Sequence, residues 1–236
     1  MGKRKMLLWG VYFFTIISVI IGVLLGNRAI TVLSEVLPLE NRHCIIIAAG
    51  HGGVDGGAIS CTGRPESAYN LEIALRLNDL FHLLGYETKM IRTEDVSVYK
   101  KGETIAQKKV SDLKERVRIC NETDNGILVS IHQNIFSDSR YSGAQVFFTD
   151  NQDSKEFAQQ IQSSFLTMNP GSKRQIKKAE GIYLMDHFQC TGVLVECGFL
   201  SNPEEEAKLR TDTYQKQLCC VIAAAVSNFL DGGTND

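Results

Sequence analysis

Residues 44–53 read CIIIAAGHGG, and this stretch decides the fold. A short isoleucine-rich run that ends at a glycine is typical of a buried strand. Two comparable runs, ILVSI at 127–131 and GVLV at 192–195, occur later in the chain. Continuous apolar strands of this kind are typical of parallel sheets that helices cover on both faces. The sequence therefore predicts a mostly parallel sheet.

Segments with helical spacing separate these runs. Between 66 and 84, apolar residues recur mainly at intervals of three and four, and Gly85 follows as a stop signal. Further helices are predicted over 111–122, 154–168, 203–210 and 213–230, further strands over 86–91 and 144–149, and a loop over 95–107. Because strands and helices alternate, we expect an α/β fold in a single compact domain.

The composition argues against a nucleic-acid partner and against a disulfide-based scaffold. The 236 residues carry a formal net charge of −2, so there is no basic excess and we expect no nucleic-acid partner. The seven cysteines are odd in number and form no CxxC pair, which argues against a disulfide framework and against a cysteine-based zinc site. We expect free thiols that serve as small apolar residues, in a reducing setting.

An uncharged apolar segment, MLLWGVYFFTIISVIIGVLL, occupies residues 6–25. About 20 apolar residues in a helix span the hydrocarbon core of a bilayer. Lys3, Arg4 and Lys5 precede it, so the positive-inside rule keeps the amino terminus in the cytoplasm. A cleaved signal peptide is the alternative, although its apolar region is usually only about 7–15 residues long. We expect a single-pass protein of the cytoplasmic membrane, with tail and transmembrane anchor over 1–27, linker over 28–42 and an extracytoplasmic domain over 43–232.

Four polar residues fall at one edge of the predicted sheet. His51, His132 and Glu196 each follow a predicted strand. Glu66 lies in the first turn of the first helix. Because ligands bind at the carboxyl ends of strands in open α/β sheets, these side chains are expected to gather there. Two imidazoles and a carboxylate form a common catalytic zinc shell, and a second carboxylate can move the proton of an attacking water.

Each of these residues also has a structural interpretation. His51 could be an exposed loop histidine, and Glu66 could favour a helix amino terminus through the helix dipole. His132 and Asn134 could cap a strand end. Glu196 is harder to explain structurally, because it interrupts an apolar run and a buried unpaired carboxylate is costly.

Four motifs in order resemble the zinc-dependent N-acetylmuramoyl-L-alanine amidases of the amidase 3 type. They are AGHGGVDGGA at 49–58, Glu66 with Asn70 and Leu71, SIHQN at 130–134, and VECGFLSNP at 195–203. The resemblance implies a roughly six-stranded sheet flanked by helices. It also implies one Zn²⁺ held by His51, Glu66 and His132, with Glu196 as the catalytic acid and base. The substrate would be peptidoglycan, cut at the amide between N-acetylmuramic acid and L-alanine.

One position departs from the family pattern. The family usually has Asp-Pro where this chain has Ala48-Ala49. A carboxylate near a metal-binding histidine fixes its orientation, so its loss predicts weaker zinc binding unless another group replaces it. A basic run, 173–178, is either a solvated loop or a contact for stem-peptide carboxylates. The residues that we expect to touch substrate are Asn134, Arg174 and Lys177.

The layout of one amino-terminal membrane segment and one domain resembles the germination-specific amidases of spore formers. That subgroup implies a role in spore-cortex maturation, where peptide removal precedes formation of muramic-δ-lactam. Whether an accessory protein takes part is not readable from the residues. Two other functions stay open: a catalytically inactive, membrane-tethered peptidoglycan-binding module, and a zinc peptidase that cuts a different wall bond.

Overall fold

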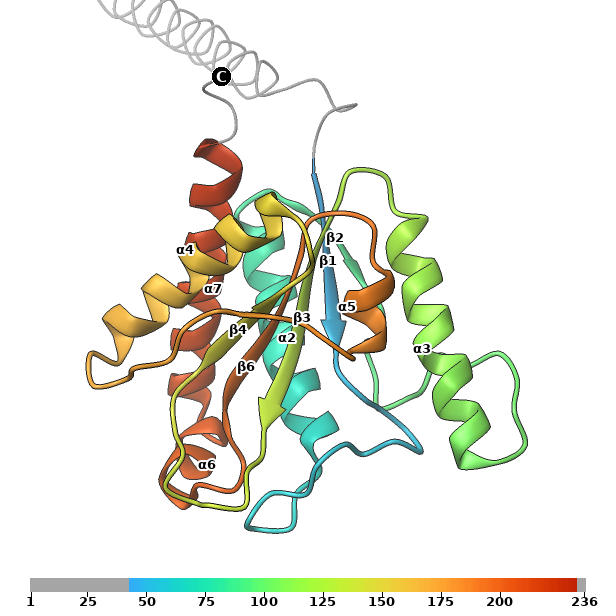
Figure 1. The fold of residues 1–236 in the computed structure, drawn as a ribbon, viewed down its shortest axis with the longest axis horizontal. Helices are drawn as coiled ribbons and strands as arrows, with labels where there is room; N and C mark the ends of the chain where they lie inside the picture. Colours follow the sequence, from blue (N-terminus) through green and yellow to red (C-terminus); the bar gives the residue numbers. More distant parts are fainter. Residues whose placement is uncertain (1–42, 233–236) are drawn as a thin grey trace, which may run out of the picture. The chain divides into compact units, whose positions relative to one another are not determined.

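The computed structural model describes residues 43–232, and a six-stranded sheet runs through them (Figure 1). The strand order is β2-β1-β3-β6-β4-β5. The strands are β1 (Cys44–Ala49), β2 (Glu87–Met90), β3 (Gly126–Asn134), β4 (Gln145–Phe148), β5 (Lys177–Lys178) and β6 (Gly192–Phe199). Strands β2, β1, β3 and β6 are parallel, whereas β4 pairs antiparallel with β6, and β5 runs parallel to β4. The predicted mostly parallel, six-stranded sheet is confirmed.

Helices cover both faces of this sheet (Figure 1). They are α2 (Glu66–Leu83), α3 (Ile105–Asn121), α4 (Gln152–Met168), α5 (Tyr183–His187), α6 (Pro203–Leu209) and α7 (Asp212–Gly232). Side chains from α2, α4 and α7 pack in one core cluster with Ile45 and Ile47 of β1. Residues of α3 and α5 pack in a second cluster with Ile46 and Ala48. Successive side chains of β1 thus point to opposite faces, and all six residues of the strand are buried.

The structure corrects several predicted boundaries. Helix α3 begins at Ile105, inside the stretch predicted as loop, because Thr104 and Gln107 form a capping box at its start. Strand β3 continues to Asn134, so His132 lies within the strand and not after it. Strand β6 likewise extends through Glu196 to Phe199. The short elements β5 and α5 were not predicted.

The seven cysteines are free, as predicted. Cys44, Cys120, Cys197 and Cys219 are buried and serve as small apolar residues. For Cys61, Cys190 and Cys220 that interpretation was wrong, because they are exposed.

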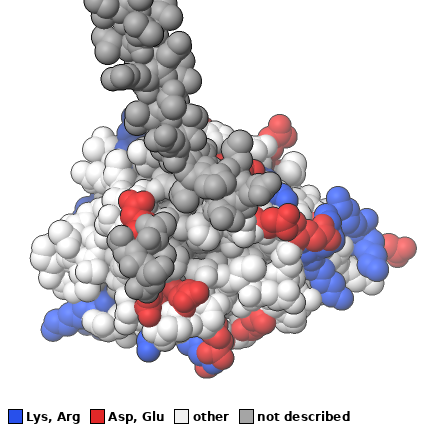
Figure 2. All heavy atoms as spheres, turned by 90° about the horizontal axis from the view of Figure 1, so that it is seen from above, with Lys and Arg blue, Asp and Glu red and all other residues white. Residues whose placement is uncertain are grey.

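The predicted anchor, tail and linker lie outside the described residues. Within 43–232, no helix combines the length and apolar character needed to cross a membrane. Figure 2 views the domain from the edge where β1 begins, and basic and acidic side chains lie beside one another on the side of α3. Helix α3 carries such pairs, with Arg118 bonded to both Glu115 and Glu122.

Candidate metal centre and active site

Three of the predicted site residues come together from separate parts of the chain. His51 lies in the loop after β1, Glu66 is the first residue of α2, and His132 lies on β3. One potential ligand atom from each residue lies within 4.8 Å of the others. The two imidazole rings meet edge to face, with their centroids 5.1 Å apart. The predicted convergence at the carboxyl edge of the sheet is therefore present.

Each histidine nitrogen lies about as far from one oxygen of Glu66 as two donors to a single zinc ion do. Glu66 Oε2 lies 3.2 Å from His51 Nε2, and Glu66 Oε1 lies 3.0 Å from His132 Nδ1. Two donors that each bind zinc at about 2.1 Å in tetrahedral geometry are about 3.4 Å apart. Imidazole nitrogen and carboxylate oxygen are also donors that zinc accepts. These three residues can hold one divalent ion, with a fourth position left for water.

Asp55 orients the first histidine. Its Oδ2 lies 3.0 Å from His51 Nδ1, which favours the tautomer with the proton on Nδ1 and leaves Nε2 facing Glu66. Lys109 Nζ lies 3.2 Å from the same Asp55 oxygen. Burial raises the pKa of Asp55, but His51 and Lys109 outweigh it and hold that pKa below its usual range. Asp55, in the glycine-rich motif, therefore provides the supporting carboxylate that Ala48-Ala49 lacks.

Glu66 is held by donors on every side. It is 4 % exposed and accepts hydrogen bonds from the backbone N–H of Ala58 (3.1 Å) and of Gln133 (3.1 Å). The Asn70 side-chain amide donates to Glu66 Oε1 at 3.1 Å and to the carbonyl of Gly50 at 3.2 Å. A carboxylate fixed in this way presents its oxygens to the two histidines with little freedom to rotate.

The cluster shifts the pKa of each member. Burial lowers the pKa of His51, but Glu66 and then Asp55 outweigh it, so that pKa is raised. Burial also lowers the pKa of His132, and there it prevails over the pull of Glu66. Burial raises the pKa of Glu66, but hydrogen bonds from His132 and His51 carry it well below its usual range. Glu66 is therefore ionised and attracts a cation to this position.

Glu196 lies directly beside the cluster. It is the register partner of His132 on the neighbouring parallel strand, which places the two backbones about 4.8 Å apart. Its Oε2 is buried and has no hydrogen-bond partner among the described residues. Burial, followed by the charge of Glu66, raises the pKa of Glu196 to about 8 in the metal-free site. A shielded carboxyl group that titrates near neutral pH suits the transfer of a proton.

Two buried arginines hold the backbone that carries His51. Arg92 donates to the carbonyls of Ala49 and Gly50, at 3.0 and 2.9 Å. Arg116 donates to the carbonyls of Ala49 and His51, at 2.9 and 2.7 Å. Both residues are 3 % exposed. Nothing in the sequence pattern indicates that these two residues bind this loop.

The three predicted substrate contacts occupy different places. Asn134 is half-buried at the end of β3, two residues beyond His132. Arg174 donates from Nε to the carbonyl of Ser142 at 2.9 Å, in the loop between β3 and β4. Lys177 is exposed on β5, which β4 separates from β6. The structure thus brings Asn134 close to the cluster and leaves Lys177 apart from it, and their contact with substrate stays a prediction.

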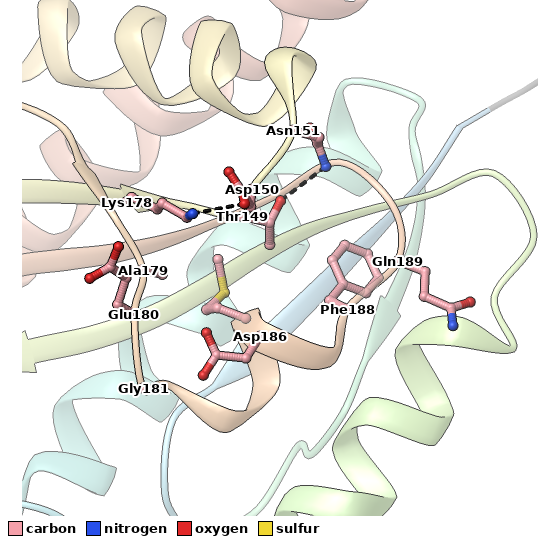
Figure 3. Close-up of a pocket in the computed structure, with 11 residues that line it drawn as sticks. Thr149, Asp150, Asn151, Lys178, Ala179, Glu180, Gly181, Asp186, Phe188 and Gln189 are labelled. Atoms are coloured by element: carbon pink, nitrogen blue, oxygen red, sulfur yellow. Dashed lines mark hydrogen bonds and ion pairs between the residues drawn. The ribbon is translucent and has the colours of Figure 1, made fainter.

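A cavity of about 480 Å³ lies elsewhere, between the end of β4, the residues around β5, and α5 (Figure 3). Lys178 and Asp150 form an ion pair of 2.7 Å in its wall. Because β4 runs antiparallel to β6, its carboxyl end points away from the edge that carries Glu196. None of the lining residues is a predicted site residue, so this cavity is separate from the metal cluster.

The chain is similar to known proteins over the whole described domain. The family model described as N-acetylmuramoyl-L-alanine amidase matches residues 45–228. A germination-specific N-acetylmuramoyl-L-alanine amidase of Bacillus subtilis (strain 168) is 32% identical over 196 residues, covering 82% of this chain and 81% of the relative.

Two solved structures share the fold. The CwlD amidase of Clostridioides difficile, solved in complex with the GerS lipoprotein, has a TM-score of 0.78 and 36% identity, covering 80% of this chain and 99% of that chain. An N-acetylmuramoyl-L-alanine amidase of Clostridium difficile 630 has a TM-score of 0.71 and 29% identity, covering 83% and 100%. Because the family model spans most of the domain and a relative is 32% identical over 82% of the chain, the chain belongs to the N-acetylmuramoyl-L-alanine amidase family.

Proposed function

We propose that this protein is a zinc-dependent amidase that removes stem peptides from spore-cortex peptidoglycan and so prepares the glycan for muramic-δ-lactam formation. The observation that carries the chemistry is the cluster of His51, Glu66 and His132 with Glu196 beside it in register. The cortex role is supported by the similarity to the germination-specific amidase of Bacillus subtilis.

Each of the four residues has a distinct role in the proposed reaction. When bound, zinc lowers the pKa of a water molecule and polarises the scissile carbonyl. His51, Glu66 and His132 would hold the ion, and Asp55 fixes the ring of His51. Glu196 accepts a proton from the attacking water and returns it to the departing L-alanine nitrogen. The products are a free lactyl carboxyl group on the sugar and a peptide with a free amino terminus.

The test is muropeptide analysis of cell wall digested by the zinc-loaded protein and by its Glu196→Ala variant. Loss of the proton carrier should lower the rate by at least about 100-fold, because general acid–base catalysis contributes about 10²–10⁴-fold. The variant should still bind zinc, since Glu196 is not a ligand in this assignment. Normal release of stem peptides by the variant would contradict the assignment.

The same digest separates the alternatives. Products with free lactyl groups mean an amidase, whereas split peptides with intact lactyl amides mean a peptidase. A wild-type protein that binds peptidoglycan but releases nothing, with zinc present, would be a binding module. Either of these last two outcomes would refute the proposed activity.

We further propose that residues 6–25 hold the protein in the cytoplasmic membrane with the catalytic domain outside. The support is the length and apolar character of this segment. A protein partner at the membrane is supported by the similar CwlD amidase, which was solved with a lipoprotein. Full-length protein should sediment with membranes, withstand a high-salt wash, and co-elute with its partner after detergent extraction. A chain that lacks residues 1–27 should stay in the supernatant, and equal sedimentation of both would argue against the anchor.

A further inference from the structure

The loop between β3 and β4 exposes an unusual group of apolar side chains. Ile135, Phe136 and Tyr141 lie within seven residues of one another and are 48%, 47% and 44% exposed. Contiguous exposed apolar side chains are a common feature of surfaces that bind other molecules. Phe136 and Tyr141 pack together, with ring centroids 4.4 Å apart and planes inclined by 48°. We call this pair of rings the aromatic platform.

Contacts beneath the platform keep it in place. Tyr141 packs on the buried Phe199 of β6 at 6.3 Å between ring centroids. The guanidinium of Arg174 lies 4.5 Å from the centre of the Phe199 ring and 5.4 Å from that of Tyr141. These contacts account for the position of Arg174 and leave the outer surface of the rings uncovered.

The backbone of the platform is tied to the segment that follows β6. The N–H of Phe136 donates to Ser201 Oγ at 3.1 Å, and the Asn202 side chain donates to the carbonyl of Tyr141 at 3.3 Å. Gly143 N–H donates to the buried Glu205 carboxylate at 2.8 Å. An exposed loop with these anchors presents its rings in one orientation, which reduces the entropy lost on binding.

The platform lies at the same edge of the sheet as the metal cluster. Phe136 follows His132 by four residues, which places their backbones at most about 14 Å apart. Phe199, beneath the platform, is the register partner of Asn134 and follows Glu196 by three residues. A polymer that enters the site can therefore touch the platform close to the bond that is cut.

We infer that the aromatic platform binds a sugar ring of the glycan strand, next to the muramic acid whose lactyl amide lies at the metal cluster. A pyranose ring presents C–H groups on its faces, and its hydroxyls surround the rim. The negative face of an aromatic ring attracts such C–H groups, and the flat surfaces exclude water. The inference rests on the proposed function for the identity of the polymer.

The charges near the platform favour the sugar over the peptide. Asp138 and Arg140 pair with one another at 2.7 Å on the same loop. Arg174 packs against the Tyr141 and Phe199 rings and donates from Nε to the carbonyl of Ser142. Stem peptides carry carboxylates, which need unpaired basic groups. A surface of two uncharged rings beside self-paired ions matches a neutral sugar better.

The experiment compares substrates of different glycan length on zinc-loaded full-length protein. One substrate is N-acetylmuramoyl-peptide alone, and the other is an uncrosslinked glycan chain of several disaccharides with its stem peptides. Phe136→Ala and Tyr141→Ala should raise the KM for the long chain, relative to the KM for the short substrate, by about tenfold. Phe136→Tyr and Tyr141→Phe keep a ring and should restore the wild-type ratio. Leu83→Ala, which removes an 83% exposed apolar side chain on α2, is the matched control.

A binding measurement separates failure of this inference from failure of the proposed function. Peptide-free glycan strands have no bond for the enzyme to cut, and their Kd is measured by calorimetry. If the wild type cleaves neither substrate, the proposed function fails, and the Kd still tests the platform. We expect both alanine variants to bind these strands about tenfold more weakly. An unchanged Kd together with an unchanged KM ratio would overturn the inference and leave the rings to a protein partner.

Discussion

The side-chain amide of Asn70 connects three parts of the metal centre. It donates to Glu66 Oε1 and to the carbonyl of Gly50, and its oxygen accepts from Gln133 Nε2 at 3.3 Å. Asn70 is fully buried, so no water can replace these bonds without rearrangement. The position of the Glu66 carboxylate therefore depends on a residue outside the cluster of His51, Glu66 and His132.

Replacing Asn70 by Ala should weaken zinc binding by roughly 10–100-fold, which is typical of lost outer contacts to a metal ligand. The metal-free protein should also lose about 1–3 kcal/mol of unfolding free energy, because buried polar groups are left unpaired. Competition with a zinc-binding dye measures the first effect, and urea unfolding measures the second. Asn78→Ala on the same helix, where the amide oxygen accepts from Thr88 Oγ1, should leave zinc affinity unchanged. Wild-type zinc affinity in Asn70→Ala would show that Glu66 does not need this support.

Residue types identified the metal cluster but not the groups around it. His51, Glu66 and His132 could be predicted because few residue types bind zinc and the family motifs contain them. The contact of Asp55 with His51 could not be predicted from the sequence. Nor could the hydrogen bonds from Arg92 and Arg116 to the carbonyls of the loop. Side-chain bonds to backbone carbonyls depend on loop conformation, which neither periodicity nor composition encodes.

At the scale of elements, the segment after β1 needs glycines because side chains of the candidate metal cluster lie very close to its backbone. A Cβ on Gly50 would lie 2.3 Å from Cε1 of His132. A Cβ on Gly57 would lie 2.6 Å from Cδ2 of His51 and 2.7 Å from Glu66 Oε2. His51 itself has a φ of 59°, in the left-handed region that non-glycine residues seldom occupy. Such strain is typical of functional sites.

Replacing Gly50 by Ala should displace the ring of His132 and weaken zinc binding by at least about tenfold. Zinc content after dialysis and the dye competition both report this change. Gly171→Ala is the control, since the nearest atom to its added Cβ would be 3.8 Å away, an ordinary contact. If the two variants bind zinc equally well, His132 is not constrained by the turn.

The helices and strands with the clearest hydrophobic pattern were predicted best. Strand β1 and helix α2 followed from a long apolar run and a helical repeat. Helix α3 starts earlier than predicted, although Thr104 and Gln107 fit a capping-box pattern that could have located it. Strand β5 has only two residues, both lysines, and carries no periodic signal. The antiparallel direction of β4 was unreadable, because alternation does not encode strand direction.

At the scale of the whole domain, metal binding and folding stability should be coupled. A ligand at about 100 times its Kd stabilises a protein by about 2.7 kcal/mol. For a domain of this size that corresponds to a rise in Tm of roughly 5–11 °C. A chelator should remove this increment, and added zinc should restore it, as measured by calorimetry. His132→Ala should show no increment, and an equal shift in that variant would place the zinc elsewhere.

The sheet ends on both sides in a short strand, and this affects how copies of the domain can associate. Strand β2 has four residues and β5 has two, and their exposed side chains include Lys89, Lys177 and Lys178. Short edge strands with charged side chains leave few backbone N–H and C=O groups with which another chain could pair. Copies of this domain should therefore resist edge-to-edge association into fibrils even at high local concentration.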